Sequence, residues 1–573
     1  MPAATAAHGL PRMWRAIRRR LAIGVLHAAS WLGRRRDYGV LTLTLTGELA
    51  EDAGESRLLG LLRRPPTDYL AVLTLLRWAR TDPQLQGVLL RVDDLRGSWA
   101  RIQGLRRAVE RLRAAGKRVW VHLERAGMSE YYLASAAERV LVTPAATLDV
   151  TGLASEALFV REALDKLGVE AEVVHVGKYK SAGEMVTRSG MSEPHREMLE
   201  ALVEDLFGQI ADGVAAGRGL DATVARDTLG RGPFVAAEAQ AGGLIDGTAY
   251  ADQAEQQLAE ACGHAEVIER DDYARRRGRA MRLDALRRAT RTVALLHVGG
   301  TIKPGESVSR PDGGGATGST SMAAALKAVR ERTDVAALIL RVASPGGSAL
   351  ASDLIWRELE RTRAAKPVIV SCGDVAASGG YYVALAGKPV LAEAGTITGS
   401  IGVVAGKATL RGLYDRLGLR KETVARGRHA SLFSDYVPLD DDGRARIQAQ
   451  ADAFYRDFTA KVAAARGLSP EAVEACAQGR VWTGRQAHGF GLVDELGGLE
   501  EAFDAARRTL GLPLDQPLLV ERLSRPRRLF DLSFLSRLPR GGVLDGLLGD
   551  LPAWRFLLRE RVWALMPFEI RFF

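Results

Sequence analysis

One serine in this sequence has the surroundings expected of a nucleophile. Ser378 lies in the run GDVAASGGYY, which starts at Gly373 and follows an apolar segment. Small residues after a strand, with paired glycines before a helix, leave the hydroxyl at the helix start, where free backbone N–H groups stabilise negative charge. The alternative is that Ser378 simply caps this helix, a common role for serine.

A lysine in the other half of the chain could serve as the base. No Gly-x-Ser-x-Gly elbow or Ser/His/Asp arrangement is apparent in the sequence. Lys180 lies in the run GKYKSA, which starts at Gly177. A lysine shielded from water can have its pKa lowered enough to take a proton from serine. The alternative is an ordinary solvated surface lysine.

An internal repeat connects these two residues. Residues 91–181 align with residues 341–431 without a gap, and 26 of the 91 pairs are identical. Ordinary composition would give roughly 6 identities. Further on, the match continues at an offset of 248, where Leu244-Ile245-Asp246 aligns with Leu492-Val493-Asp494. Two homologous domains follow from this match.

The differences between the copies are more informative than the identities. The first copy has Met128 where the second has Ser378, and Glu130 where the second has a glycine. Conversely, Lys180 of the first copy aligns with Ala430 of the second. One copy therefore keeps the serine and the other keeps the lysine, which predicts a single composite site where the two domains meet.

A glycine-rich turn also belongs to the second copy alone. Its sequence is SPGGS, from Ser344 to Ser348, where the first copy has DLRGS. Consecutive glycines let the backbone approach a ligand closely and leave an N–H pointing outward. The alternative is a helix-capping turn, with Ser348 as the cap.

The elements that must position these residues alternate between strand and helix. Apolar runs predict strands, and amphipathic stretches between them predict helices. In the first copy the strands are 40–45, 88–92 and 119–123, with a helix over 102–115. In the second copy the strands are 293–298, 337–342 and 368–372, with a helix over 354–365. This order predicts an α/β fold of two tandem homologous domains with parallel βαβ units.

The predicted domains are flanked by segments of different composition. The prediction divides the chain into residues 1–37, a basic and apolar segment; 38–262, the domain with Lys180; 263–291, a charged linker; 292–515, the domain with Ser378; and 516–573, an aromatic and basic extension. The chain has three widely separated cysteines, which argues against a disulfide framework and against a zinc site. No cofactor or metal is expected.

The net charge of +10 favours an anionic lipid surface over nucleic acid because of where the arginines lie. They flank the apolar run 21–33, whose 13 residues are fewer than the about 20 that a spanning helix needs. We expect an interfacial or signal-anchor segment, the alternative being an arm packed on its own protein. The extension 516–573 has a similar composition and is interpreted as a second surface anchor or an oligomer contact.

The combined motifs resemble the signal peptide peptidase A (protease IV) family in its long tandem-domain form. They are SPGGS, GDVAASGGYY, GKYKSA and TGSIG, the last starting at Thr398, and the resemblance covers about residues 40–512. The resemblance implies a crotonase- or ClpP-like fold in each domain. It also implies a homotetramer at the inner membrane, with catalytic domains on the periplasmic side, that digests cleaved signal peptides.

The resemblance also assigns roles to five residues. It implies that Ser378 is the nucleophile and Lys180 the general base, and that Ser400 orients the lysine. The oxyanion amides fall on Gly347 and Gly379. The two ends of the chain depart from the family pattern, which leaves the mode of membrane attachment open. Two other classes remain as alternatives: a crotonase-like enzyme acting on acyl-CoA, and a non-catalytic membrane scaffold.

Overall fold

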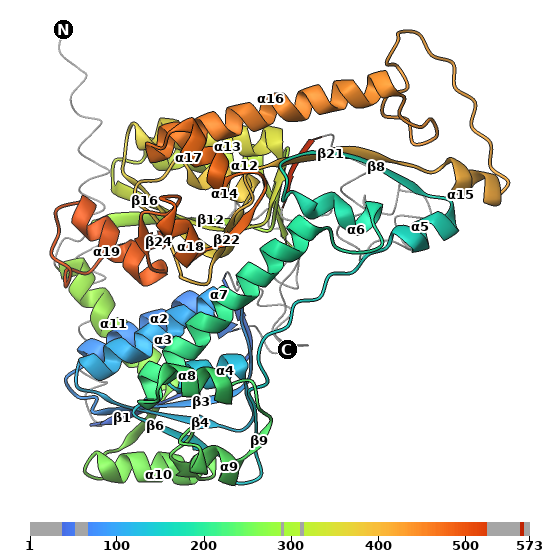
Figure 1. Ribbon diagram of the computed structural model, residues 1–573. Coiled ribbons are helices and arrows are strands. Elements are labelled where there is room, and N and C mark those ends of the chain that lie inside the picture. The colour runs from blue at the N-terminus through green and yellow to red at the C-terminus, as the bar shows by residue number, and fades with distance from the viewer. Residues whose placement is uncertain (1–36, 52–66, 288–290, 310–314, 524–561, 566–573) are drawn as a thin grey trace, which may run out of the picture.

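The protein consists of two α/β units that pack against each other, as seen in a computed structural model (Figure 1). The structure describes residues 37–51, 67–287, 291–309, 315–523 and 562–565. The predicted N-terminal membrane segment, and most of the predicted C-terminal extension, lie outside these residues. Within the described part of the chain, no helix is both long and apolar enough to cross a bilayer.

The first unit is built on a parallel sheet with the strand order β10-β6-β4-β3-β1-β11. Its strands are β1 (Val40–Ala50), β3 (Gly87–Arg96), β4 (Arg118–Leu123), β6 (Arg139–Val142), β10 (Gly247–Thr248) and β11 (Val267–Glu269). Its helices are α2 (Tyr69–Thr81), α3 (Trp99–Ala114), α4 (Met128–Ala134), α5 (Arg161–Leu167), α6 (Glu184–Thr187), α7 (Glu193–Arg218), α8 (Ala222–Thr228), α9 (Ala236–Ala241) and α10 (Ala251–Ala261). Four further short strands belong to this unit: β2 (Thr67–Asp68), β5 (Ala126–Gly127), β7 (Thr147–Asp149) and β9 (Phe234–Val235).

The second unit repeats this plan in the parallel order β23-β19-β18-β16-β12-β24. β20 also pairs with β18 in this sheet, and β22 pairs antiparallel with β20. Its strands are β12 (Thr292–Gly299), β16 (Val335–Ser344), β18 (Val368–Ala377), β19 (Val390–Ala392), β20 (Ile397–Gly399), β22 (Val481–Thr483), β23 (Glu495–Leu496) and β24 (Leu519–Arg522). Its helices are α12 (Ser319–Glu331), α13 (Ala349–Arg363), α14 (Gly379–Ala384), α15 (Arg411–Arg416), α16 (Asp441–Arg466), α17 (Pro470–Cys476), α18 (Gly484–Gly489) and α19 (Leu499–Thr509). Between the units lies α11 (Arg270–Arg287), in the charged stretch. The predicted fold class of two tandem homologous α/β domains is confirmed.

The repeat is visible in matching contacts as well as in matching elements. Among the helices in the described residues, α7 and α16 are the longest; they have 26 residues each and end at the left-handed glycines Gly219 and Gly467. The Tyr131 hydroxyl donates to the Leu244 carbonyl at 2.9 Å, and the Tyr381 hydroxyl donates to that of Leu492 at 2.8 Å. Because these buried hydroxyls need partners, the same bond holds α4 and α14 in place in the two units.

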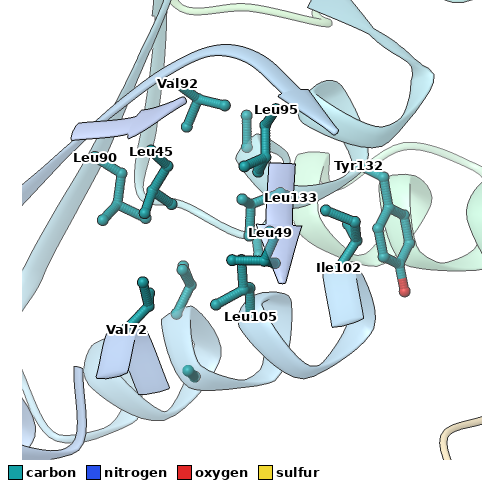
Figure 2. Close-up of a cluster of buried hydrophobic side chains, with 14 of the residues drawn as sticks. Leu45, Leu49, Val72, Leu90, Val92, Leu95, Ile102, Leu105, Tyr132 and Leu133 are labelled. Atoms are coloured by element: carbon teal, nitrogen blue, oxygen red, sulfur yellow. The ribbon is translucent and has the colours of Figure 1, made fainter. Parts of the chain in front are cut away.

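The core of the first unit fills the space between its sheet and the helices α2, α3 and α4 (Figure 2). Side chains from alternate positions of β1 and β3, such as Leu45, Leu49, Leu90 and Val92, meet Ile102 and the helical residues around it. Burial of this apolar surface is the main stabilising contribution to such a layered unit. The strands predicted at 40–45 and 88–92 lie within β1 and β3, and the helix predicted at 102–115 corresponds to α3, which covers the sheet.

A third sheet joins the two units. Its strand order is β14-β15-β13-β17-β25-β21-β8, from strands β8 (Glu170–Val176), β13 (Thr301–Lys303), β14 (Val308–Ser309), β15 (Gly315–Gly318), β17 (Gly346–Ser348), β21 (Val403–Thr409) and β25 (Val562–Leu565). β8 of the first unit pairs antiparallel with β21 of the second over seven residues. Since the loop with Lys180 follows β8 directly, this pairing carries the lysine to the second unit.

Charged and polar side chains also hold the units together. The guanidinium of Arg107 on α3 forms a bidentate ion pair with Glu393, whose side chain is almost fully buried, and Arg107 Nε donates to Glu501 at 3.2 Å. On the long helix α7, Asp205 accepts from Arg485 of the second unit at 2.8 Å. Bidentate arginine–carboxylate pairs have a defined geometry, so they fix how one unit sits on the other.

Candidate active site

Ser378 lies where β18 ends and α14 begins. Its side chain is fully buried, and its backbone has φ 53° and ψ −117°, which is unusual for a residue other than glycine. Its backbone N–H donates to the Gly399 carbonyl at 2.8 Å. Ser378 stands at the N-cap position of α14, but its side chain makes no capping hydrogen bond there, so capping does not account for its hydroxyl. Such strained positions cluster at active sites.

Ser348, in contrast, does cap a helix. Its hydroxyl accepts from the Ala351 N–H at the start of α13. The capping interpretation of Ser348 is thus confirmed.

Lys180 reaches Ser378 directly. Its Nζ lies 2.9 Å from Ser378 Oγ, 2.9 Å from Ser400 Oγ and 3.1 Å from the Ser400 carbonyl oxygen. The lysine is 2% exposed, which excludes a solvated surface lysine. Burial lowers the pKa of the Lys180 ammonium well below its usual range, because the charged form loses its hydration. A neutral amine at hydrogen-bond distance from a serine hydroxyl can act as a general base.

Ser400 shares the unusual backbone of Ser378. Its φ is also 53°, and its N–H donates to the Arg480 carbonyl at 2.7 Å. This conformation turns both its hydroxyl and its carbonyl toward Lys180 Nζ. The two contacts restrict the flexible lysine side chain to one position opposite Ser378.

The two candidate oxyanion donors belong to β17 and to the start of α14. Gly347 is in β17 with φ 153°, and a Cβ at this position would overlap the carbonyl oxygen of Ile302 in the adjacent β13. Only glycine fits there. Gly379 is the first residue of α14, so its N–H has no acceptor within the helix. The turn before β17 is fixed by Ser344, whose hydroxyl accepts from the Gly346 N–H at 3.1 Å.

Residues 478–480 also position the lysine, and the sequence analysis missed them. The Tyr179 N–H donates to the Gln478 carbonyl at 2.8 Å, and the Lys178 N–H donates to Gln478 Oε1 at 2.9 Å. Gly479 has φ 75°, and a Cβ there would lie 2.6 Å from Lys180 Cβ. The first copy has Arg231 at the position equivalent to Gly479 at an offset of 248. The comparison of copies that isolates Lys180 could therefore have found this glycine too.

The equivalent position of the first copy lacks the chemical groups of the second. Met128 is packed into the core, and Ala430, which aligns with Lys180, is exposed. Glu130, two residues after Met128, is partly buried, and this burial raises the pKa of its carboxyl. A second site made of Met128 and Ala430 would therefore have neither the serine nor the lysine, in agreement with a single composite site.

Comparisons with known proteins give the family. The family model described as peptidase family S49 matches this chain twice, over residues 111–265 and 360–512. The serine protease SPPA, chloroplastic, of Arabidopsis thaliana is 34% identical over 510 residues, which cover 88% of this chain and 73% of that protein. Protease 4 of Haemophilus influenzae is 31% identical over 497 residues, covering 82% of this chain and 79% of that protein.

A third relative and one solved structure complete the comparison. Protease 4 of Salmonella typhi is 30% identical over 562 residues, covering 92% of this chain and 85% of that protein. A ClpP1 mutant from Listeria monocytogenes shares 15% identity at a TM-score of 0.25, over 37% of this chain and 95% of that one, and at that score it carries no argument. The two family matches and the three relatives lead to one conclusion: the chain belongs to peptidase family S49 and is a serine peptidase.

Proposed function

We propose that this serine peptidase works with a Ser/Lys dyad, in which Ser378 is the nucleophile and Lys180 the general base. The observation that carries the proposal is the 2.9 Å contact between Lys180 Nζ and Ser378 Oγ in a fully buried site. A neutral amine has two hydrogens and one lone pair. The hydrogens match the two oxygens of Ser400, which leaves the lone pair to accept the Ser378 hydroxyl proton.

The reaction proceeds as an acyl transfer. Ser378 Oγ attacks a peptide carbonyl carbon while Lys180 takes its proton, and the N–H groups of Gly347 and Gly379 stabilise the oxyanion. Each such donor contributes about 3 kcal/mol to transition-state stabilisation. Protonated Lys180 then gives its proton to the leaving amine, and water, deprotonated by the same lysine, hydrolyses the acyl-enzyme.

The proposed substrates are extended, apolar peptides, such as cleaved signal peptides. Support comes from the third sheet, because an extended peptide binds strand edges through main-chain hydrogen bonds. A fluorophosphonate probe tests the chemistry. We expect it to label Ser378 in the full chain and to leave Ser378→Ala unlabelled, with Lys180→Ala labelled very slowly. An unlabelled wild-type protein that hydrolyses no peptide would favour the scaffold, and hydrolysis of acyl-CoA alone would favour the crotonase-like enzyme.

We also propose a homo-oligomer, which the resemblance gives as a tetramer. In the chain, β8 pairs with β21, and their repeat equivalents are residues 420–426 and 153–159. Both ranges are described, and neither forms a strand. The same register between two chains would pair residues 153–159 of one with 420–426 of the next, a head-to-tail contact that forms a ring when the rotation between neighbours closes. Light scattering should find an oligomer for the wild type and smaller species for Val424→Pro.

The proposed location is the inner membrane, with the catalytic units on its periplasmic side. Support comes from the arginine-flanked apolar run within residues 1–37. Flotation with vesicles that contain anionic lipid tests this attachment. We expect the full chain to float and a chain that begins at Asp37 to remain in solution.

A further inference from the structure

The side chain of Arg480 lies between the two units, beside the loop that carries Lys180. Arg480 immediately precedes β22, and its guanidinium carbon lies 4.7 Å from the centre of the Tyr179 ring and 4.6 Å from that of the Trp482 ring. Its Nη1 donates to the Glu197 carboxylate on α7 at 2.7 Å. The Arg480 side chain is only 17% exposed, so residues of both units cover most of it.

The two partners from the first unit also contact each other. The Tyr179 hydroxyl donates to the Glu197 carboxylate and lies 3.0 and 3.1 Å from its two oxygens. The hydrogen bonds from Arg480 and from Tyr179 lower the pKa of the Glu197 carboxyl, because they favour its charged form. A planar guanidinium that stacks on aromatic rings and donates to a carboxylate has a defined orientation. These contacts therefore fix the Arg480 side chain relative to the first unit.

The backbone beside this side chain positions the lysine of the proposed dyad. The Arg480 carbonyl accepts from the Ser400 N–H at 2.7 Å, and Ser400 contacts Lys180 Nζ through its hydroxyl and its carbonyl. Tyr179, which precedes Lys180, donates its N–H to the Gln478 carbonyl at 2.8 Å. One short segment thus binds both the Lys180 loop and the Ser400 turn, and the Arg480 side chain ties that segment to the first unit.

The internal repeat separates this side-chain cluster from the common fold. The offset of 248 (441 − 193) that relates α7 to α16 places Ala445 at the position equivalent to Glu197. At the same offset, Gly232 is the equivalent of Arg480. Each charged residue therefore occurs in one copy only, as the serine and the lysine do. This distribution indicates a role in the composite site, because a role in the common fold would call for the same residues in both copies.

We propose that Arg480 is a positioning residue that aligns Lys180 with Ser400 across the boundary between the units. This inference rests on the proposed Ser/Lys mechanism. Arg480 acts through its carbonyl, which holds Ser400, and through its side chain, which the first unit holds. Gly479, the residue before it, packs directly against Lys180. Loss of the side-chain contacts would therefore loosen this segment, displace the lysine and admit water to its buried amine.

Steady-state kinetics of Arg480→Met in the full chain, on a fluorogenic peptide, test this proposal. Methionine keeps an apolar side chain of similar length and removes the charge and the hydrogen bond to Glu197. We expect kcat to fall by about 10- to 100-fold with KM unchanged, because a displacement of about 1 Å costs about 100-fold in rate. The midpoint of the pH profile of kcat/KM should rise by about one unit, since hydration of the Lys180 ammonium and loss of a nearby positive charge both raise its pKa. Arg480→Lys should recover part of kcat, because it keeps the charge opposite Glu197.

Arg485→Met is the matched control. Arg485 donates to Asp205 at 2.8 Å, also on α7, and this pair joins the two units as well. Loss of this pair should lower the midpoint of urea unfolding as Arg480→Met does, but kcat and the pH profile should stay those of the wild type. An equal loss of kcat in both variants would show that any contact between the units matters, and it would overturn the positioning role.

A second variant keeps the test decisive if Arg480→Met does not fold. Glu197→Gln removes the same ion pair from the partly exposed side, and it should also lower kcat and raise the pH midpoint. Wild-type kcat in both variants, or a higher KM with unchanged kcat, contradicts the positioning role and leaves the dyad standing. A wild type that hydrolyses no peptide and takes no fluorophosphonate on Ser378 contradicts the dyad itself.

Discussion

Replacing Gly479 by alanine should impair catalysis by displacing Lys180. The new Cβ would lie 2.6 Å from Lys180 Cβ and 2.7 Å from its backbone nitrogen. Non-bonded carbon atoms prefer a separation of about 3.5–4.0 Å, so the lysine must move by about 1 Å. The Nζ–Oγ distance to Ser378 is now 2.9 Å, and such a move takes it beyond the about 3.2 Å reach of a productive hydrogen bond. A misplacement of about 1 Å costs about 100-fold in rate, and we expect kcat/KM to fall by this factor.

The matched control is Gly467→Ala, at the end of α16. Gly467 has φ 66°, close to the 75° of Gly479, but a Cβ there would meet nothing within 4 Å. Both variants should lose about 1–2 kcal/mol of folding stability, since alanine is strained in this conformation. Only Gly479→Ala should lose activity, measured as kcat/KM on a fluorogenic peptide and as the rate of fluorophosphonate labelling. Equal activity of the two variants would refute the displaced-lysine argument.

The remaining predictions concern the dyad, its pH dependence and the interface between the units. Ser378→Ala and Lys180→Ala should each abolish peptide hydrolysis while circular dichroism stays unchanged, and the double variant should be little worse, because the two residues act as a unit; full activity of Lys180→Ala would identify another base. In the wild type, kcat/KM should rise with pH through one ionisation below the free-lysine pKa of about 10.4, because burial lowers the pKa of Lys180 and only its neutral form accepts a proton; a flat profile from about pH 6 to 10, with chemistry rate-limiting, contradicts this. Between the two pKa values the folded state binds fewer protons than the unfolded chain, so the contribution of Lys180 to stability rises with pH, and Lys180→Met should raise the midpoint of urea unfolding at neutral pH; a clearly lower midpoint contradicts a buried neutral lysine. Arg107→Met should destabilise the protein by about 3 kcal/mol in urea unfolding, because Glu393 keeps a buried charge without its partner, and adding Glu393→Gln should recover part of the loss; unchanged stability of Arg107→Met would contradict a structural role for the pair. Met128→Ser should create no second fluorophosphonate-labelled serine, and labelling of residue 128 would contradict a single composite site.

The sequence alone leads to the fold class and to the pair Ser378 and Lys180. Both follow from the repeat. The residues that the two copies share indicate a common fold, and the residues found in one copy only, such as Ser378 and Lys180, indicate what each copy contributes to the site. The strands at 88–92 and 337–342 are also predictable, since buried parallel strands form continuous apolar runs.

The contacts that place the lysine could not be derived in this way. The left-handed backbones of Ser378 and Ser400 follow from the bonds that their N–H groups make, and no local pattern encodes them. The contact of Gly479 with Lys180 joins loops almost 300 residues apart and depends on how the units dock. The composition of residues 516–573 suggested an anchor or an oligomer contact, whereas the pairing of β25 uses main-chain groups, which composition does not reveal.

The division of the proposed dyad between two units determines when its chemistry could begin during synthesis. Lys180 leaves the ribosome 198 residues before Ser378 (378 − 180), which is about 10–40 s at a typical 5–20 residues per second. The loop at Gly479 follows later still. A nascent chain therefore holds a lysine without a serine, and then both without the contact that aligns them. With the proposed dyad, peptidase activity would begin only after the second unit has folded and docked, which would protect the unfinished polypeptide from its own active site.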